Sequence, residues 1–358
     1  MSYLLALGPF HPAWRGPQRI ILRLEGEHVA DLEYRDAYNE RGCAERLARL
    51  DLPQALHLVT RICGTCSFAH SLAFCTALED LCNIAVPERA AYGRCIIAEL
   101  ERLISHLQAS SRLFESLGME QRATVLVTLR ESAVQMLKTL SGVRVIPDLC
   151  LPGGLHRDIE DHDRETFIAA LPKLSHALYR FIDGVFDHRA LFNRTVGVGV
   201  LPRSAAEQFG VRGPLARATG ITHDVRVDHP YAAYEQLTYQ LITQENGDVY
   251  ARLIVLLFEA FESTKLIEQA LQGLPEGAWQ GAFPEELPRG QGKGAVEGPR
   301  GMLRYTVESD SRRITRVRID TPRQLDRLLA RTLLSGALVD DVVAIVASCD
   351  PCIACAER

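Results

Sequence analysis

Apolar residues recur every three or four positions through the middle of the chain, and this spacing predicts amphipathic helices. We expect helices over residues 67–81, 87–117, 122–141 and 166–194, and one long or broken helix over 234–271. The apolar face of the second helix is formed by Leu100, Leu103, Ile104, Leu107, Phe114 and Leu117. The middle of the chain is therefore expected to be a bundle of long helices.

Toward both ends the pattern changes to short runs that are typical of strands. Residues 19–24 and 28–34 are expected to form one hairpin, and residues 302–308 and 313–320 a second. Shorter helices are expected over residues 40–50, 322–335 and 338–347. Segments rich in Pro and Gly are expected to be loops or connections: 1–18, 145–154, 197–220 and 273–300.

These elements together predict an α+β fold that is mainly α, with a central bundle and small antiparallel sheets near the N-terminus and in the C-terminal third. We expect three regions integrated into one domain. Residues 1–50 hold a β-hairpin and loops, 51–300 a helical core, and 301–358 a hairpin and helices. A chain of 358 residues is long enough to bury a large core.

Composition narrows the classes of protein that the chain can be. With 47% hydrophobic and 24% charged residues it is typical of a globular protein. The net charge of -5 and the lack of a basic stripe argue against a nucleic-acid partner. No apolar run is long enough to span a bilayer, and the start lacks the basic region of a signal peptide. We therefore expect a cytoplasmic location, where ten cysteines are thiols or metal ligands rather than disulfides.

Two Cys-x-x-Cys pairs are the strongest chemical feature of the sequence. The first is Cys63-Gly64-Thr65-Cys66, and the second is Cys352-Ile353-Ala354-Cys355 near the other end of the chain. One such pair is a weak signal, but two pairs offer four thiolates to one soft metal. The spacing alone leaves a structural zinc site and a catalytic metal centre equally open.

Together with their flanking residues, the pairs carry a family resemblance. Arg61-Ile62-Cys63-Gly64-Thr65-Cys66 with His70, and Asp350-Pro351-Cys352-Ile353-Ala354-Cys355, resemble the two motifs of NiFe-hydrogenase large subunits. Gly8-Pro9-Phe10-His11-Pro12 and Gly298-Pro299-Arg300-Gly301 are similar to segments of the energy-converting, membrane-associated class and of its relative, the catalytic subunit of complex I. The complex I relative lacks the four cysteines, so their presence favours a hydrogenase.

The resemblance implies a nickel–iron centre held by the four cysteines. Cys63 and Cys352 would bind nickel terminally, while Cys66 and Cys355 would bridge nickel and iron. The iron would carry carbon monoxide and cyanide ligands. No iron–sulfur cluster is expected in this chain itself. Cys349, beside the second pair, is not expected to be a ligand.

Further residues gain roles from the same resemblance. Arg300, after Pro299, matches an arginine suspended over the metals, with Asp350 as its carboxylate partner. Otherwise Arg300 is a surface charge after a turn, and Asp350-Pro351 a turn-former. Thr321 matches a hydroxyl that hydrogen-bonds a cyanide, but Thr321-Pro322 also suits the start of a helix. His70 is either a donor to a bridging sulfur or a satisfied core histidine.

The sequence departs from the family at the proton exit. Where these hydrogenases carry a glutamate before the first strand, the alignment places Gly16, as in the complex I relative. Glu40 stands where a related motif has histidine, and Ala44 where it has glutamate, although a slip of one residue would offer Glu45. Glu40 is either a substitute relay or a solvated acid at a helix start.

The leading hypothesis is the catalytic large subunit of an energy-converting NiFe hydrogenase, which interconverts protons and H2. Cys352 would take the proton, assisted by Arg300. The expected partners are an iron–sulfur hydrogenase small subunit, ferredoxin-like electron-transfer subunits and integral membrane subunits that translocate ions. They would hold the chain peripherally on the cytoplasmic face of the membrane. The alternatives are a complex-I-like redox coupling subunit, whose metal site is vestigial or filled by zinc, and a structural zinc protein.

Overall fold

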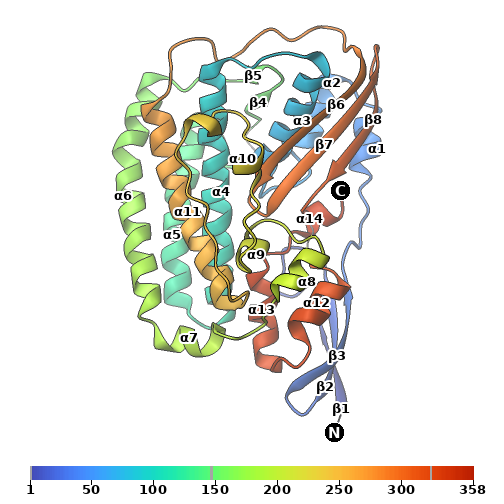
Figure 1. Ribbon diagram of the computed structural model, residues 1–358, viewed down its shortest axis with the longest axis vertical. Helices are drawn as coiled ribbons and strands as arrows, with labels where there is room; N and C mark the ends of the chain where they lie inside the picture. Colours follow the sequence, from blue (N-terminus) through green and yellow to red (C-terminus); the bar gives the residue numbers. More distant parts are fainter. Residues whose placement is uncertain (1, 146–147, 323–324) are drawn as a thin grey trace.

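Four long helices lie side by side and form one half of the molecule (Figure 1). The computed structural model describes residues 2–145, 148–322 and 325–358. The four helices are α4 (Glu88–Ser116), α5 (Glu120–Ser141), α6 (Asp161–Phe186) and α11 (Val249–Gln272). They confirm the expected bundle and the α+β class.

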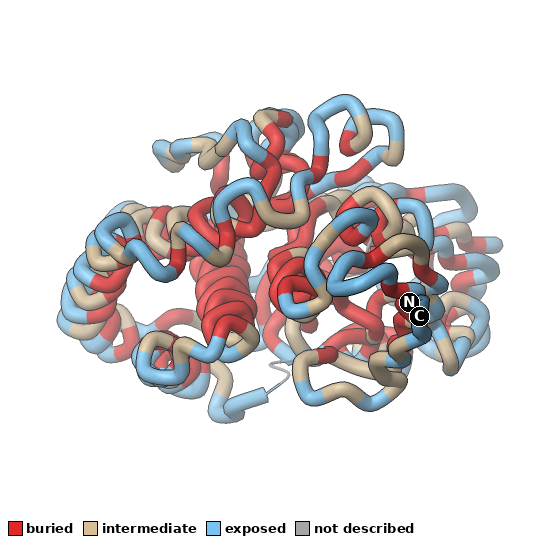
Figure 2. Tube along the Cα trace, turned by 90° about the horizontal axis from the view of Figure 1, so that it is seen from below, coloured by how far each residue is buried: buried red, intermediate tan, exposed pale blue. Residues whose placement is uncertain are grey.

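The central position of α4 explains why it is buried on nearly every side. It packs against both α5 and α11, whereas α5 and α6 each expose one face to solvent, as the view along the bundle shows (Figure 2). Polar residues of α4 such as Glu99, Arg102 and His106 are therefore fully buried. Buried polar groups are costly unless they are hydrogen-bonded, so these side chains need partners on neighbouring elements.

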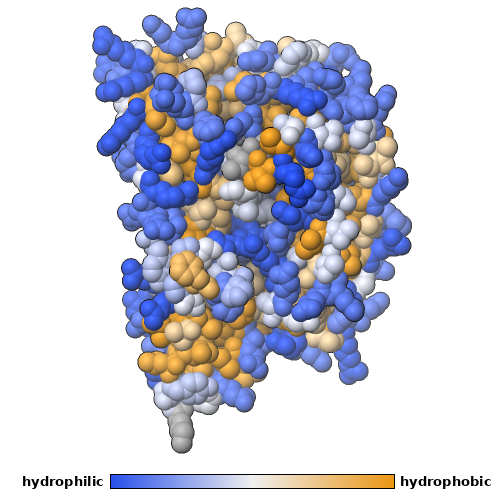
Figure 3. All heavy atoms as spheres, turned by 180° about the vertical axis from the view of Figure 1, so that it is seen from behind, coloured by the Kyte–Doolittle hydropathy of each residue, from blue (hydrophilic) through white to orange (hydrophobic). Residues whose placement is uncertain are grey.

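A three-stranded antiparallel sheet lies at the N-terminal end of the molecule, in the order β1 (Ser2–Leu7), β2 (Arg19–Glu25) and β3 (His28–Arg35). The loop expected over residues 1–18 is therefore wrong for β1, whose continuous apolar run does not alternate. This edge strand exposes Tyr3 and Leu4, and apolar atoms gather at the lower end of the view from behind, where the sheet lies (Figure 3).

A second antiparallel sheet consists of β6 (Arg289–Gly298), β7 (Gly301–Asp310) and β8 (Ile314–Asp320). The hairpin β7–β8 confirms the sequence prediction, but β6 was expected to be a loop. Its glycines pack directly on α3 (Ser67–Cys82): a Cβ on Gly292 would lie 2.1 Å from the Ala77 carbonyl oxygen. Glycine is required here by close approach to a helix, and so the strand has no apolar alternation.

The remaining described elements are short. They are α1 (Cys43–Leu47), α2 (Leu52–Val59), β4 (Cys150–Leu151), β5 (Gly154–Leu155), α7 (Arg189–Thr195), α8 (Arg203–Gln208), α9 (Pro214–Arg217), α10 (Val225–Asp228), α12 (Arg327–Leu334), α13 (Val342–Ser348), α14 (Ile353–Ala356) and the 3-10 turns Tyr234–Gln236 and Val339–Asp341. No helix in the described ranges is both long and apolar enough to cross a bilayer.

Two of the predicted helices are interrupted in the structure. The helix expected over 166–194 is divided into α6 and α7. The one expected over 234–271 is helical only in a 3-10 turn and in α11, because the segment between them bonds to α11 side chains. The Thr238 and Gln240 amides, for example, donate to Gln269 and Glu262.

The helix expected over 322–335 begins later, at Arg327, and Asp326 caps it by accepting from the Leu329 amide. Thr321 and Pro322 are thus not its first residues. Arg323 and Gln324, like residues 146–147 of the expected connection 145–154 and Met1, lie outside the described residues.

Candidate metal centre

The two cysteine pairs meet although 289 residues separate Cys63 from Cys352 in sequence. Cys63 Sγ lies 3.3 Å from Cys352 Sγ, and Cys66 Sγ lies 3.5 Å from Cys355 Sγ. The sulfur atoms of Cys63, Cys66 and Cys355 all lie within 4.8 Å of one another. Each cysteine is at most 4% exposed. Four soft donors converging in a buried space fit a thiolate-bound metal centre.

Both pairs are held at the starts of helices. Cys66 directly precedes α3, and Cys352 directly precedes α14. Asp350 has a φ of 46°, and this reversal after α13 turns the chain back toward the first pair. Arg41 joins the two loops, because its Nη2 donates to the carbonyls of Ile62 at 2.7 Å and Ala354 at 2.5 Å.

The thiols of the cluster differ in pKa, as Cys352 and Cys66 show. Hydrogen bonds with Cys355 and Cys63 hold the pKa of Cys352 well below its usual range. Hydrogen bonds with Cys352 and Cys355, together with burial, raise the pKa of Cys66. Of these two thiols, Cys352 therefore loses its proton more readily than Cys66.

Arg300 lies beside the sulfur cluster and is fixed by Asp350. Its Nε donates to the Asp350 carbonyl at 2.9 Å, and Nη2 lies 2.8 Å from the carboxylate. Its Nη1 donates to Thr65 Oγ1 at 3.2 Å. Although burial opposes the charge, Asp350 and the Cys352 thiolate raise the pKa of Arg300 further. A permanent cation is thus held beside the cluster, and Asp350 is its partner in these contacts.

The turn that carries Arg300 is tightly positioned. It links β6 to β7, and Pro299 within it is buried. Arg102 donates to the carbonyls of Gly298 at 3.1 Å and Glu297 at 2.5 Å. Across the turn, a Cβ on Gly213 would lie 2.2 Å from the Arg300 carbonyl oxygen.

His70 lies on the other side of the cluster and is fully buried. Its Nε2 is 3.5 Å from Cys355 Sγ, and its Nδ1 is 2.7 Å from the Tyr305 hydroxyl. Burial lowers the pKa of His70 to about 4, so the imidazole is neutral at physiological pH. In the tautomer whose Nδ1 accepts from the Tyr305 hydroxyl, Nε2 carries the proton and donates to the Cys355 sulfur.

Three other residues that the sequence singled out are Thr321, Glu40 and Gly16. Thr321 follows β8 and, within the described residues, makes no hydrogen bond to the cluster. Glu40 is exposed and lines a surface groove beside α1, together with Ala44 and Glu45. Gly16 does lie against the second pair: a Cβ there would be 2.8 Å from Ile353 Cβ. The fold therefore leaves no room for a glutamate side chain at this position.

Sequence reasoning missed three residues at the site. Thr65 contacts Cys63 and Arg300, and its position within the first pair could have identified it. Arg15, next to Gly16, has a side chain that is 9% exposed and lies 3.2 Å from the Asp350 carboxylate. Arg41 bonds to both cysteine loops and stands directly after Glu40 in the sequence.

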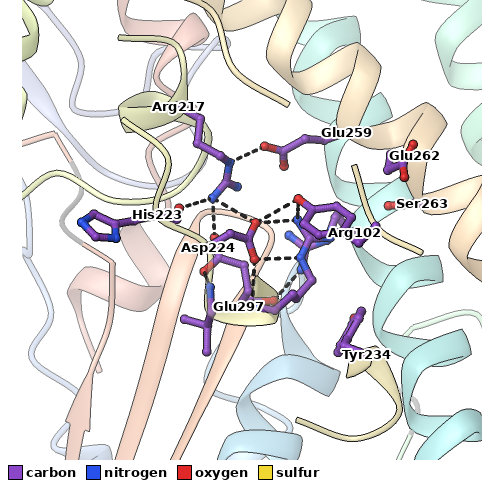
Figure 4. A network of polar contacts seen from close by, with 12 residues as sticks. Arg102, Arg217, His223, Asp224, Tyr234, Glu259, Glu262, Ser263 and Glu297 are labelled. Carbon is purple, nitrogen blue, oxygen red and sulfur yellow. Dashed lines mark hydrogen bonds and ion pairs between the residues drawn. The ribbon is translucent and has the colours of Figure 1, made fainter. Parts of the chain in front are cut away.

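A buried ionic network adjoins the site (Figure 4). It joins three arginines to four acids on or directly beside α4, α9, α10, α11 and β6, and His106 of α4 pairs with one of these acids. Arg217 lies 2.6 Å from Glu259 and 2.9 Å from Glu297, and Arg226 lies 2.7 Å from Asp224. Although burial opposes it, Arg217 and His106 lower the pKa of Glu259 to about 2. The members are Arg102, Arg217, Arg226, Glu99, Asp224, Glu259, Glu297 and His106.

Two family models match the chain. The model of the 49 kDa subunit of respiratory-chain NADH dehydrogenase matches residues 117–285 and 284–358. The model of nickel-dependent hydrogenases matches residues 41–109, which include the first cysteine pair.

Individual proteins of both kinds resemble the chain over its length. The carbon monoxide-induced hydrogenase of Rhodospirillum rubrum is 30% identical over 100% of this chain and 99% of its own. A subunit of the NADH-quinone oxidoreductase of Dehalococcoides mccartyi is 33% identical over 98% and 96%. A chain in the structure of a membrane-bound sulfane sulfur reductase, an archaeal respiratory membrane complex, is 28% identical. It superposes with a TM-score of 0.94 over 100% of this chain and 98% of its own.

The comparisons agree with the motifs and with the geometry of the site. The chain therefore belongs to the oxidoreductase family that comprises the 49 kDa subunit of the respiratory-chain NADH dehydrogenase and the large subunits of membrane-bound, nickel-dependent hydrogenases.

Proposed function

We propose that the chain is the catalytic large subunit of an energy-converting, membrane-associated NiFe hydrogenase that reversibly reduces protons to H2. One observation carries this proposal: four cysteine sulfurs converge in a buried space, beside an arginine that carboxylate and hydroxyl groups hold in place. A redox coupling subunit without a metal centre has no need of such a donor set.

The donor set fits a nickel–iron centre. Cys63 and Cys352, which face each other, would be the terminal ligands of nickel, and Cys66 and Cys355 would bridge nickel and iron. When bound, the centre, with carbon monoxide and cyanide on its iron, would supply the redox chemistry of H2. Burial of all four cysteines excludes bulk water from the donors.

The surrounding residues have separate tasks in this proposal. The Cys352 thiolate holds the proton that the reaction releases or consumes. Arg300, oriented by Asp350, presents a fixed guanidinium to the centre and to the thiolates. Neutral His70 donates to the bridging sulfur of Cys355 and withdraws charge from it.

Partners would supply the electrons and couple the reaction to ion movement. We propose an iron–sulfur small subunit with ferredoxin-like electron-transfer subunits behind it, and integral membrane subunits that translocate ions. The matched structure is a respiratory membrane complex, which supports this assembly. The apolar edge strand β1 also supports a protein partner, since exposed apolar patches are typical of interfaces. The chain would then be bound peripherally to the cytoplasmic face of the membrane.

One observation favours the second candidate, a complex-I-like coupling subunit whose cysteine site is vestigial or holds zinc. Gly16, packed against Ile353, leaves no space for the glutamate that hydrogenases of this class carry, and the complex I relative shares this feature. The four cysteines weigh against this candidate, because that relative lacks them.

Infrared spectroscopy of the complex purified from its own host, combined with nickel and iron analysis, tests the proposal. Metal-bound carbonyl and cyanide absorb in a window that is nearly free of protein bands. We expect bands there together with both metals. A complex that contains zinc or no metal, and shows no such bands, would contradict the hydrogenase assignment and favour the coupling subunit.

A further inference from the structure

Thr65, the third residue of the first cysteine pair, contacts both sulfurs proposed as terminal ligands. Its Oγ1 lies 3.3 Å from Cys63 Sγ and 4.0 Å from Cys352 Sγ. It also accepts a hydrogen bond of 3.2 Å from Arg300 Nη1. Within the described residues the hydroxyl makes no hydrogen bond to backbone, so it does not serve as a cap or turn former.

The contacts of the Thr65 hydroxyl fix the direction of its hydrogen bonds. A guanidinium has only donors, so the bond from Arg300 occupies a lone pair of Oγ1. A metal-bound cysteine has lost its proton, and its sulfur can only accept. Between a donor and two acceptors, the hydroxyl hydrogen therefore points toward a sulfur, with Cys63 nearer than Cys352.

The orientation of Arg300 makes this arrangement rigid. Its Nε and Nη2 are engaged by the carbonyl and the carboxylate of Asp350, which leaves Nη1 directed at Thr65. Asp350 in turn precedes the second pair by two residues. One chain of polar contacts thus links the second cysteine loop, through Arg300, to a hydroxyl within the first.

Gly16 offers the second loop no side chain that could hydrogen-bond a sulfur. It packs against Ile353, and a Cβ there would already be too close. Of the described side chains, the Thr65 hydroxyl is the uncharged oxygen within hydrogen-bonding reach of the terminal pair.

We propose that Thr65 is a positioning residue of the metal centre, which donates a hydrogen bond to the terminal thiolates and withdraws charge from them. It thereby supplies a polar contact to the thiolate pair that the fold excludes at Gly16. This inference rests on the proposed function and concerns a residue to which the family resemblance gave no role.

Infrared spectroscopy of variants in the assembled complex tests this role. Thr65→Val removes the hydroxyl at nearly constant volume, and Thr65→Ser keeps it. Without the donor, the sulfurs and the metals become richer in electrons, so the carbonyl band of Thr65→Val is expected at lower wavenumber. Thr65→Ser is expected to restore the wild-type band. Activity should fall roughly tenfold in Thr65→Val, the factor that loss of one hydrogen bond to a charged group gives.

Ser67→Ala is a matched control. Ser67 also carries a hydroxyl beside the first pair, but it donates to the Thr60 carbonyl at 2.8 Å rather than to sulfur. Its removal should leave the carbonyl band in place. If Thr65→Val does not retain nickel, Thr65→Ala replaces it; metal loss in both, with normal metal content in Thr65→Ser, also supports a required hydroxyl.

Two results would overturn the inference, and they differ from each other. Coincident bands in wild type and Thr65→Val would show that the hydroxyl does not act on the thiolates, while the hydrogenase proposal stands. Absence of carbonyl and cyanide bands from the wild-type complex would remove the proposed function, and the role of Thr65 with it, before any variant is compared.

Discussion

The buried arginines of the ionic network and those at the sulfur cluster differ in how their charges and hydrogen-bond donors are satisfied. In the ionic network, Arg102 and Arg226 have hydrogen-bond partners on all three guanidinium nitrogens. At the sulfur cluster, Arg15 and Arg300 share the single carboxylate of Asp350. None of the three nitrogens of Arg15 makes a hydrogen bond within the described part of the chain.

This difference in hydrogen bonding indicates that the two groups of arginines have different functions. In the network each of the four acids is paired with at least one of the three arginines, so these ion pairs can hold α4, α11 and β6 in place. The two arginines at Asp350 are balanced only when nearby cysteines are thiolates. A bound metal would keep those thiolates deprotonated, so the charge balance at Asp350 would depend on the proposed metal centre, whereas that of the network would not.

The largest effect is expected when one of the four cysteine sulfurs of the cluster is removed. Cys355→Ser replaces a soft ligand by a hard one, so we expect loss of both nickel and measurable H2 activity. Metal analysis and hydrogen production measure the effect. Cys349→Ser is the control, because Cys349 donates to the Ile345 carbonyl at 3.3 Å and serine can do the same. Activity and bound metals that survive in Cys355→Ser would exclude the bridging role.

The next largest effect is expected in the network. Arg217→Met removes the cation between Glu259 and Glu297 and leaves the buried Glu297 carboxylate without its ion-pair partner, which should cost about 3–5 kcal/mol of unfolding free energy. Denaturant unfolding measures it. Arg203→Met breaks an exposed pair with Glu207 and should cost at most about 1 kcal/mol. Equal losses in both variants would show that the network contributes no more to stability than a surface pair.

Glu101 lies between the two regions and gives a pH test. It is buried and accepts from the amides of Phe68 and Ala69 at the start of α3. Burial raises its pKa to about 7, so the folded state binds more protons than the unfolded state between roughly pH 4.5 and 7. Its contribution to stability is present below this window and is lost as pH rises through it.

Glu101→Gln removes that dependence. Relative to the variant, the wild type should lose about 3 kcal/mol of unfolding free energy between pH 4.5 and 8, as measured by denaturant unfolding at each pH. Glu120→Gln, at an exposed position at the start of α5, is the control and should follow the wild type. A difference between wild type and Glu101→Gln that stays constant with pH would show that Glu101 titrates normally.

The smallest effect is expected from a change to Arg300 at the sulfur cluster. Arg300→Lys keeps a charge but cannot bond Asp350 and Thr65 together, so activity should fall roughly 30-fold, about 2 kcal/mol, with little change in stability. Initial rates and thermal unfolding separate the two. Arg304→Lys, an exposed arginine on β7, is the control. A variant that loses stability rather than activity would place Arg300 with the network.

The helical bundle could be predicted because its signal is local. Residues 87–117 repeat apolar side chains at the helical period, and α4 covers nearly the same range. The strand β6 could not be predicted, since its glycines are set by contact with α3, a segment more than 200 residues away in sequence. The same holds for residues 237–248, where the amides of Thr238 and Gln240 bond to α11 side chains instead of continuing a helix.

The sequence by itself determined the chemistry of this protein: four cysteines in two pairs, an arginine after Pro299, and an aspartate before Pro351. Only the tertiary structure decided which groups act together. It placed Thr65 and Arg15 at the site, left Glu40 on the surface, and gave Thr321 no bond to the cluster within the described residues. The physical reason is that residue type and spacing fix what a side chain can bind, whereas distances of about 3 Å arise from the packing of elements that are distant in sequence.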